Sequence, residues 1–145
     1  AVLYKDIAYF NGPLSPYYHA ILLKIFGVSI APVLVSNLII IALISILLSV
    51  IVQRFSDRIT GLLVVFAYLT LFAFAQSIPW NSVFNYVAPY SHELTHGILL
   101  SLIFIFFFSR FLEFNHKPSL YFAALIFGLI FLGNYLPIHG NFQPG

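Results

Sequence analysis

Near the middle of the chain, His92, Glu93 and His96 have the types and spacing of a zinc site. In the H-E-x-x-H pattern, two histidines one helical turn apart bind Zn²⁺ and the glutamate activates the bound water. A catalytic zinc needs a third protein ligand. Glu113 cannot supply it, because it lies roughly 30 Å further along the same expected helix. Two residues elsewhere remain open as that ligand: Asp6 and His139.

The same motif also has a purely structural interpretation. Ser91 has the right residue type to cap the helix, and Glu93 in the first turn complements the positive end of the helix dipole. The two histidines then lie at the polar end of a spanning helix. Both interpretations stay open from the sequence.

Asp6 is the other acidic residue that the sequence singles out. A carboxylate in or beside a membrane is costly, so it is usually kept for pairing or for function. Asp57 and Glu113 each have an arginine close by in the sequence, and we interpret them as solvated or paired. Asp6 follows Lys5 in a segment rich in tyrosine, which suits a binding site. In the alternative, the tyrosines anchor at headgroup level and Asp6 pairs with Lys5.

Composition places these residues in a membrane protein. Of the 145 residues, 61% are hydrophobic and 7% are charged, against about 45–50% and about 25% in soluble domains. The 17 Phe and 9 Tyr would leave large apolar patches exposed in water. A net charge of +2 on scattered residues does not predict nucleic-acid binding. Because the chain begins at Ala1 and contains no Met, we expect it to be part of a longer protein.

Four apolar runs reach the length of about 17–25 residues that a bilayer requires. They are residues 30–52, 62–78, 94–112 and 119–136. Before them, residues 14–26 combine apolar side chains with His19 and Lys24, which predicts an interfacial amphipathic helix. The expected fold is therefore an all-α integral membrane protein. Its parts are an outer loop and interfacial helix (1–29), a four-helix transmembrane region (30–136) and an outer, truncated tail (137–145).

The positions of Lys and Arg predict the orientation of these spans. The link after the first span holds Arg54 and Arg58, and the link after the third is flanked by Arg110 and Lys117. Cytoplasmic loops carry such an excess of basic residues. The loop between the second and third spans has none, and we expect it to face outside together with the N-terminus.

Several short segments of the chain occur in an order that is typical of one enzyme family. They are Tyr4-Lys5-Asp6, Tyr9, Gly12-Pro13-Leu14, Tyr17-Tyr18, residues 23–27, residues 85–91, and Gly128-Leu129 with Phe131-Leu132. This order resembles GT-C membrane glycosyltransferases, in the bacterial branch related to dolichyl-phosphate-mannose protein mannosyltransferases (glycosyltransferase family 39). Family members usually have a further helix before the first outer loop, ending in a catalytic acidic residue, and this chain begins after that point.

The resemblance implies transfer of a sugar from a polyprenyl-phosphate donor to a lipid, glycan or protein acceptor. It places the enzyme in the bacterial inner membrane, among membrane lipids, with the reaction on the outer face. Asp6 would be catalytic, Lys5, Tyr9 and His19 would bind substrate, and a divalent cation on the leaving phosphate is a possible cofactor. Two alternatives stay open: a membrane zinc metalloprotease that uses His92, Glu93 and His96, and a non-catalytic membrane subunit.

Overall fold

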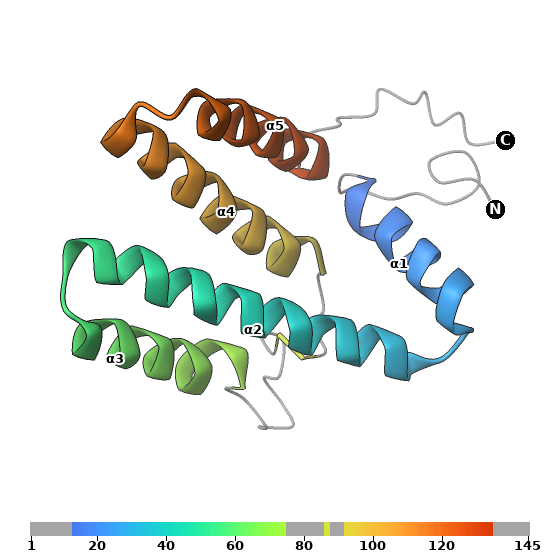
Figure 1. Cartoon of the computed structure of the whole chain (residues 1–145). Helices are drawn as coiled ribbons and strands as arrows, with labels where there is room; N and C mark the ends of the chain where they lie inside the picture. The colour runs from blue at the N-terminus through green and yellow to red at the C-terminus, as the bar shows by residue number, and fades with distance from the viewer. Residues whose placement is uncertain (1–12, 75–85, 88–91, 135–145) are drawn as a thin grey trace, which may run out of the picture.

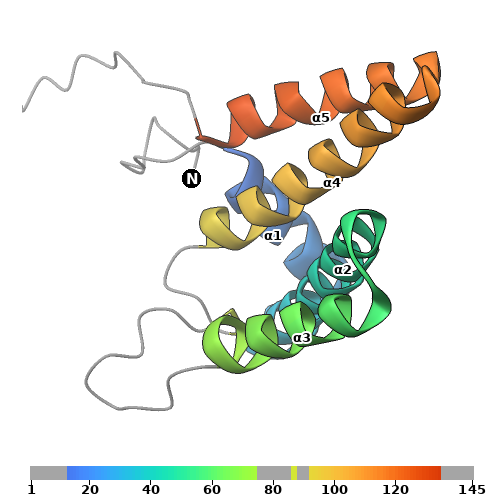
Figure 2. The same ribbon diagram turned by 90° about the vertical axis from the view of Figure 1, so that its left-hand side faces the viewer.

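The computed structural model describes residues 13–74, 86–87 and 92–134, and every regular element in these ranges is a helix. The elements are α1 (Leu14–Phe26), α2 (Ile30–Phe55), α3 (Arg58–Tyr68), the π-helical turn η1 (Leu69–Ala73), α4 (His92–Phe114) and α5 (Lys117–Asn134). Helices α2 and α3 form one hairpin, and α4 and α5 form another (Figure 1). Both hairpin turns lie at one end of the molecule, and α1 lies at the other (Figures 1 and 2). The all-α prediction is confirmed for this part of the chain.

Local sequence signals account for where the helices begin and end. After α1, Gly27 has φ 88°, a conformation that glycine adopts without steric cost. The Ser29 side chain accepts a hydrogen bond from a backbone N–H in the first turn of α2. Asp57 caps α3 in the same way, with its Oδ1 3.0 Å from the backbone nitrogen of Thr60. Asn115, with φ 48°, turns the chain from α4 into α5.

Two helices are long and apolar enough to cross a membrane. Helix α2 has 26 residues and α4 has 23, which correspond to about 39 Å and about 34 Å at 1.5 Å per residue. The helices over Arg58–Ala73 and Lys117–Phe131 are also apolar but shorter. Two of the four predicted spans therefore meet the length criterion in the structure. Part of the predicted span 62–78 lies outside the described residues.

The helices overlap the predicted ranges but differ from them at their ends, most of all α3, which begins at Arg58 rather than at residue 62 and gives way to η1 at Leu69. Helix α1 covers the predicted residues 14–26. Helix α2 continues to Phe55 rather than ending at residue 52, and α4 begins at His92. Helix α5 begins at Lys117, so Pro118 lies in its first turn, where a missing backbone N–H costs nothing.

A small apolar core joins the first hairpin to α4. It is built on Ile40, Ile41 and Ile44 of α2, with Tyr68 and Ala73 from the second arm of the hairpin. Leu48, Leu69, Val87, Ile98, Leu99 and Leu102 pack against it. Most other large apolar side chains are exposed, among them those of α3 and α5 that face away from the neighbouring helices. An apolar exterior of this extent suits a lipid environment rather than water.

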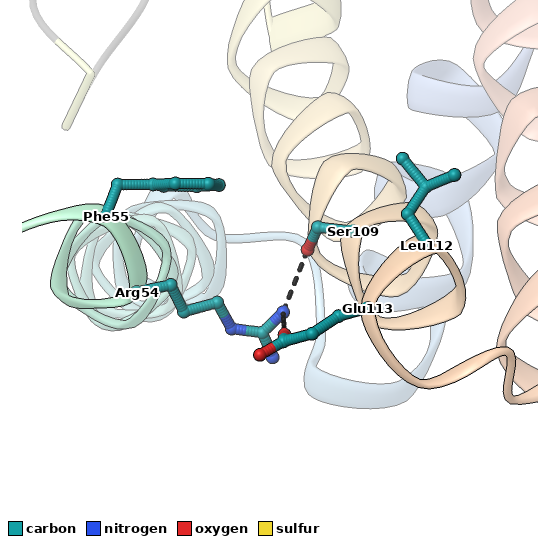
Figure 3. Close-up of a pocket in the computed structure, with 5 residues that line it drawn as sticks. All are labelled: Arg54, Phe55, Ser109, Leu112 and Glu113. Carbon is teal, nitrogen blue, oxygen red and sulfur yellow. Dashed lines mark hydrogen bonds and ion pairs between the residues drawn. The ribbon is translucent and has the colours of Figure 1, made fainter.

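An arginine joins the two hairpins near their turns. Arg54 Nη1 donates a hydrogen bond to Ser109 Oγ at 2.9 Å and lies 3.8 Å from Glu113 Oε2 (Figure 3). Its guanidinium also lies over the Phe106 ring, 4.8 Å from the centroid. Glu113, interpreted from the sequence as solvated or paired, lies near Arg54 of the other hairpin.

Candidate functional site

Three histidines meet where α1 crosses the beginning of α4. The His19 ring centroid lies 4.3 Å from that of His92 and 5.5 Å from that of His96. The centroids of His92 and His96 are 6.5 Å apart. We call these three residues the histidine cluster. It joins a residue of α1 to the two histidines of the H-E-x-x-H motif.

Ser15 holds two of these rings in place. Its hydroxyl oxygen lies 2.6 Å from His96 Nδ1. The backbone of Ser15 forms a hydrogen bond with the ring of His19, one turn later on the same helix. Ser15 itself is only 3% exposed, so both contacts are shielded from solvent. The serine therefore fixes how α1 faces α4.

Each ring in the cluster also has a buried nitrogen without a hydrogen-bond partner. These atoms are His19 Nε2, His92 Nδ1 and His96 Nε2. Burial disfavours the charged imidazolium and lowers the pKa of His19 below its usual 6.5, more than the Ser15 backbone hydrogen bond raises it. His19 is therefore neutral at pH 7, with a lone pair on one ring nitrogen. An unpartnered nitrogen in a neutral imidazole can donate to an anion or accept from a proton donor, depending on the tautomer.

Tyr18 of α1 contacts both α4 and α2. Its ring lies edge-on to His96, with centroids 5.0 Å apart. Its hydroxyl is 2.5 Å from Ser36 Oγ, and Ser36 is buried within α2. Tyr18 thus ties α1 to both hairpins.

An apolar groove runs along α1 and α2 beside Tyr18. Its volume is about 590 Å³, within the range of small-molecule and cofactor sites. Leu22 and Phe26 of α1 line one side, and Val35 and Ile39 of α2 line the other. The polar Tyr18–Ser36 contact belongs to the wall of the same groove. The groove offers space for an apolar chain next to groups that can bind a polar head.

The structure brings together some of the predicted site residues. His19, predicted to bind substrate, meets His92 and His96 of the alternative zinc site. Glu93 lines a water-sized cavity together with Ser15 and His96. Lys5, Asp6, Tyr9, Ser91 and His139 lie outside the described residues.

The third histidine of the cluster was missed as a partner of the zinc motif. The candidates named from the sequence were Asp6 and His139, whereas the structure places His19 against the two motif histidines. As the side chains stand, no group of three or more His, Asp or Glu residues in the described ranges is arranged to hold a metal ion.

Comparison with known proteins finds no relative for this chain: no protein-family model, curated protein or solved structure matches it. The class that the structure itself defines is a helical protein with two candidate membrane-spanning helices.

Proposed function

We propose that the chain is part of a membrane glycosyltransferase that moves a sugar from a polyprenyl-phosphate donor to a lipid, glycan or protein acceptor on the outer face of the membrane. The observation that carries the proposal is the apolar groove between α1 and α2, which lies beside the Tyr18–Ser36 contact and near the histidine cluster. A donor with a long apolar chain and a phosphate head needs these two environments side by side.

The position of α1 also supports the proposal. It lies at the end of the molecule away from both hairpin turns (Figure 1), and it combines exposed Ile21, Ile25 and Phe26 with the polar His19 and Lys24. This combination is typical of a helix in the headgroup region. The segment that holds the proposed residues Lys5, Asp6 and Tyr9 directly precedes α1 in the sequence.

The proposed chemistry follows from the nature of the leaving group. A carboxylate such as Asp6 can take the proton of the acceptor hydroxyl as it attacks the sugar. The polyprenyl phosphate leaves as an anion, which Lys5 or a divalent cation can neutralise. His19 lies on α1, the helix that also lines the groove, and would bind the donor, and Tyr9 would supply an aromatic surface on which a sugar can stack. The proposal assigns the groove to the isoprenoid chain.

The test is to measure sugar transfer from a panel of polyprenyl-phosphate sugars by the full-length protein in membranes. We expect Asp6→Asn to lower the rate by about a hundredfold or more, because it removes the proton acceptor and keeps the shape. The matched control is Asp57→Asn, which changes an exposed carboxylate in the turn between α2 and α3 and should transfer normally. Unchanged activity in Asp6→Asn would refute the role of Asp6, and no transfer by the wild type from any donor would refute the function.

A further inference from the structure

We propose that a cavity between the ends of α2 and α4 binds the headgroup of one class of membrane lipid, phosphatidylethanolamine. The cavity has a volume of about 310 Å³, at the lower end of the range for small-molecule sites. Its lining comes from both helices: Arg54 and Phe55 from α2, and Ser109, Leu112 and Glu113 from α4. The proposal does not depend on the transferase reaction, because the cavity lies near the two hairpin turns and α1 lies at the other end of the molecule (Figure 1).

Two side chains of opposite charge point toward one another in this cavity from different helices. Arg54 Nη1 lies 3.8 Å from Glu113 Oε2 (Figure 3), which is longer than the roughly 2.7–3.2 Å of an N–H···O hydrogen bond. The Glu113 side chain is 55% exposed, and ion pairs in such a setting contribute little to stability. A ligand that binds between the two side chains would therefore displace only a weak contact.

Arg54 has the donors that a phosphate group requires. A guanidinium carries several N–H groups in one plane, and two of them can donate to two phosphate oxygens at once. Among the described residues, the Arg54 side chain donates one hydrogen bond, to Ser109 Oγ at 2.9 Å. The Phe106 ring, whose centroid is 4.8 Å from Arg54 Cζ, covers one face of the guanidinium. Arg54 is thus held in place while its other N–H groups can donate to a phosphate.

Glu113 determines which phospholipid the cavity favours. The headgroup of phosphatidylethanolamine carries an ammonium group a short distance from its phosphate. With the phosphate on Arg54, this ammonium can donate to the Glu113 carboxylate as a charge-assisted hydrogen bond. The quaternary ammonium of phosphatidylcholine has no N–H to donate, and the net negative charge of phosphatidylglycerol has no cation to offer Glu113. A cavity with one cation and one anion therefore fits the zwitterion that has a hydrogen-bond donor.

The position of the cavity along the helices suits a lipid headgroup. Arg54 lies about 36 Å from the beginning of α2 at 1.5 Å per residue, beyond the roughly 30 Å of a hydrocarbon core. When α2 crosses a bilayer from its first turn, Arg54 reaches the headgroup region. Phe55 and Leu112, which are 80% and 67% exposed, can then contact the acyl chains of the same lipid.

The experiment measures which lipid the full chain retains. The protein is stripped of lipid in detergent and mixed with equal amounts of phosphatidylethanolamine, phosphatidylcholine and phosphatidylglycerol, and bound lipid is counted by native mass spectrometry. Phosphatidylglycerol is included because Arg58 and Lys117 begin α3 and α5 at the same two turns and attract anionic lipids of any kind. We expect phosphatidylethanolamine to be retained about tenfold more than either of the others.

Two variants assign the binding to the cavity. Glu113→Gln removes the charge and keeps the shape, so it should lower the preference for phosphatidylethanolamine over phosphatidylcholine from about tenfold to about twofold or less. Its matched control is Asp57→Asn, an exposed carboxylate in the α2–α3 turn, which should keep the preference of the wild type. Arg54→Gln should lower retention of phosphatidylethanolamine by about tenfold, whereas Arg58→Gln, at an exposed arginine of the same turn, should leave it unchanged.

Several results would overturn the proposal. They are equal retention of phosphatidylethanolamine and phosphatidylcholine by the wild type, retention of phosphatidylglycerol above phosphatidylethanolamine, and a preference in Glu113→Gln equal to that of the wild type. Glycerophosphoethanolamine, which is the same headgroup without acyl chains, should not displace the lipid at equal concentration. Displacement under that condition would assign the cavity to a soluble phosphate ester. If Arg54→Gln fails to fold, Glu113→Gln decides, because it changes an exposed side chain.

Discussion

Asn37 is a fully buried polar side chain in α2, with an exposed fraction of 0%. Its Nδ2 donates a hydrogen bond to the backbone carbonyl of Val87 at 2.9 Å. In an apolar helix such a residue ordinarily joins helices by hydrogen bonding. In the structure it instead fastens residues 86–87 to α2, where Tyr86 also hydrogen bonds to Ala73 through its backbone nitrogen at 3.3 Å. Asn37 therefore holds the connection that leads from the first hairpin to α4.

Replacing Asn37 by alanine should destabilise the protein by about 1–2 kcal/mol, because the change removes this hydrogen bond and leaves a small cavity. Unfolding in mixed micelles measures the free energy. Ser45→Ala is the control: Ser45 Oγ donates to the carbonyl of Ile41 at 2.9 Å within the same helix, and its loss should cost less than about 0.5 kcal/mol. Equal stability of Asn37→Ala and the wild type would show that the contact to Val87 contributes nothing.

The histidine cluster shows which part of a site can be predicted from sequence. The pairing of His92 with His96 follows from their spacing, because residues four apart share one face of a helix. The approach of His19 does not follow from any local pattern. It depends on how α1 packs against α4, and on contacts such as that of Ser15 with His96, 81 residues away in the chain. The residues before α1 that carry the predicted catalytic Asp6 lie outside the described part of the chain.

At the scale of the elements, α3 depends on a single exposed cap. Asp57 Oδ1 accepts hydrogen bonds from both the hydroxyl and the backbone N–H of Thr60. These two hydrogen bonds hold the pKa of Asp57 below its ordinary value, and the bond from the hydroxyl contributes more than the bond from the backbone N–H. Between the lowered and the ordinary pKa, the folded protein binds fewer protons than the unfolded chain, so stability rises with pH there.

Protonation of Asp57 should therefore weaken the start of α3. Its contribution is complete above the unfolded carboxyl pKa of about 3.9 and is lost as the pH falls through the lowered folded value. We expect Asp57→Ala to lower the melting temperature at pH 7 and to reduce the loss of stability in acid. Asp57→Asn caps without titrating, so it should stay close to the wild type at pH 7. A melting temperature of Asp57→Ala equal to the wild type at pH 7 would contradict the role of the cap.

The bounds of α1 and the beginning of α2 were predictable because their signals are local, whereas α3 begins at Arg58 and not at the predicted residue 62. Gly27, Ser29 and Asp57 stop or start helices through their own backbone and side-chain contacts. The extension of α2 through Phe55 was not foreseen, because the hydrophobic run ends earlier. There Arg54 lies along α4 and reaches Ser109 and Glu113 (Figure 3), so contacts in the folded molecule favour a longer helix.

At the scale of the whole molecule, the arrangement of the two hairpins bears on topology. Both turns lie at one end, and α1 lies at the other (Figures 1 and 2). Only α2 and α4, among the described helices, have the length of a membrane span. Helix α3 returns along α2, and α5 returns along α4 (Figure 1). Each hairpin therefore carries the chain back toward the end at which the hairpin began, as the four-span prediction requires. The exposed apolar side chains of α3 and α5 favour contact of these two helices with lipid or with further helices.

The chain contains no cysteine, so single cysteines can be placed to report the side of the membrane. Val28 is 95% exposed before α2. The variant Val28→Cys should therefore react with a membrane-impermeant maleimide added to intact spheroplasts. Ser56→Cys and His116→Cys lie in the two hairpin turns and should react only after permeabilisation, since basic residues near these turns favour the cytoplasmic side. The cysteine-free wild type controls for background. Reaction of all three variants in intact cells would contradict the spanning of α2, whereas the reverse pattern would keep the fold and invert its orientation.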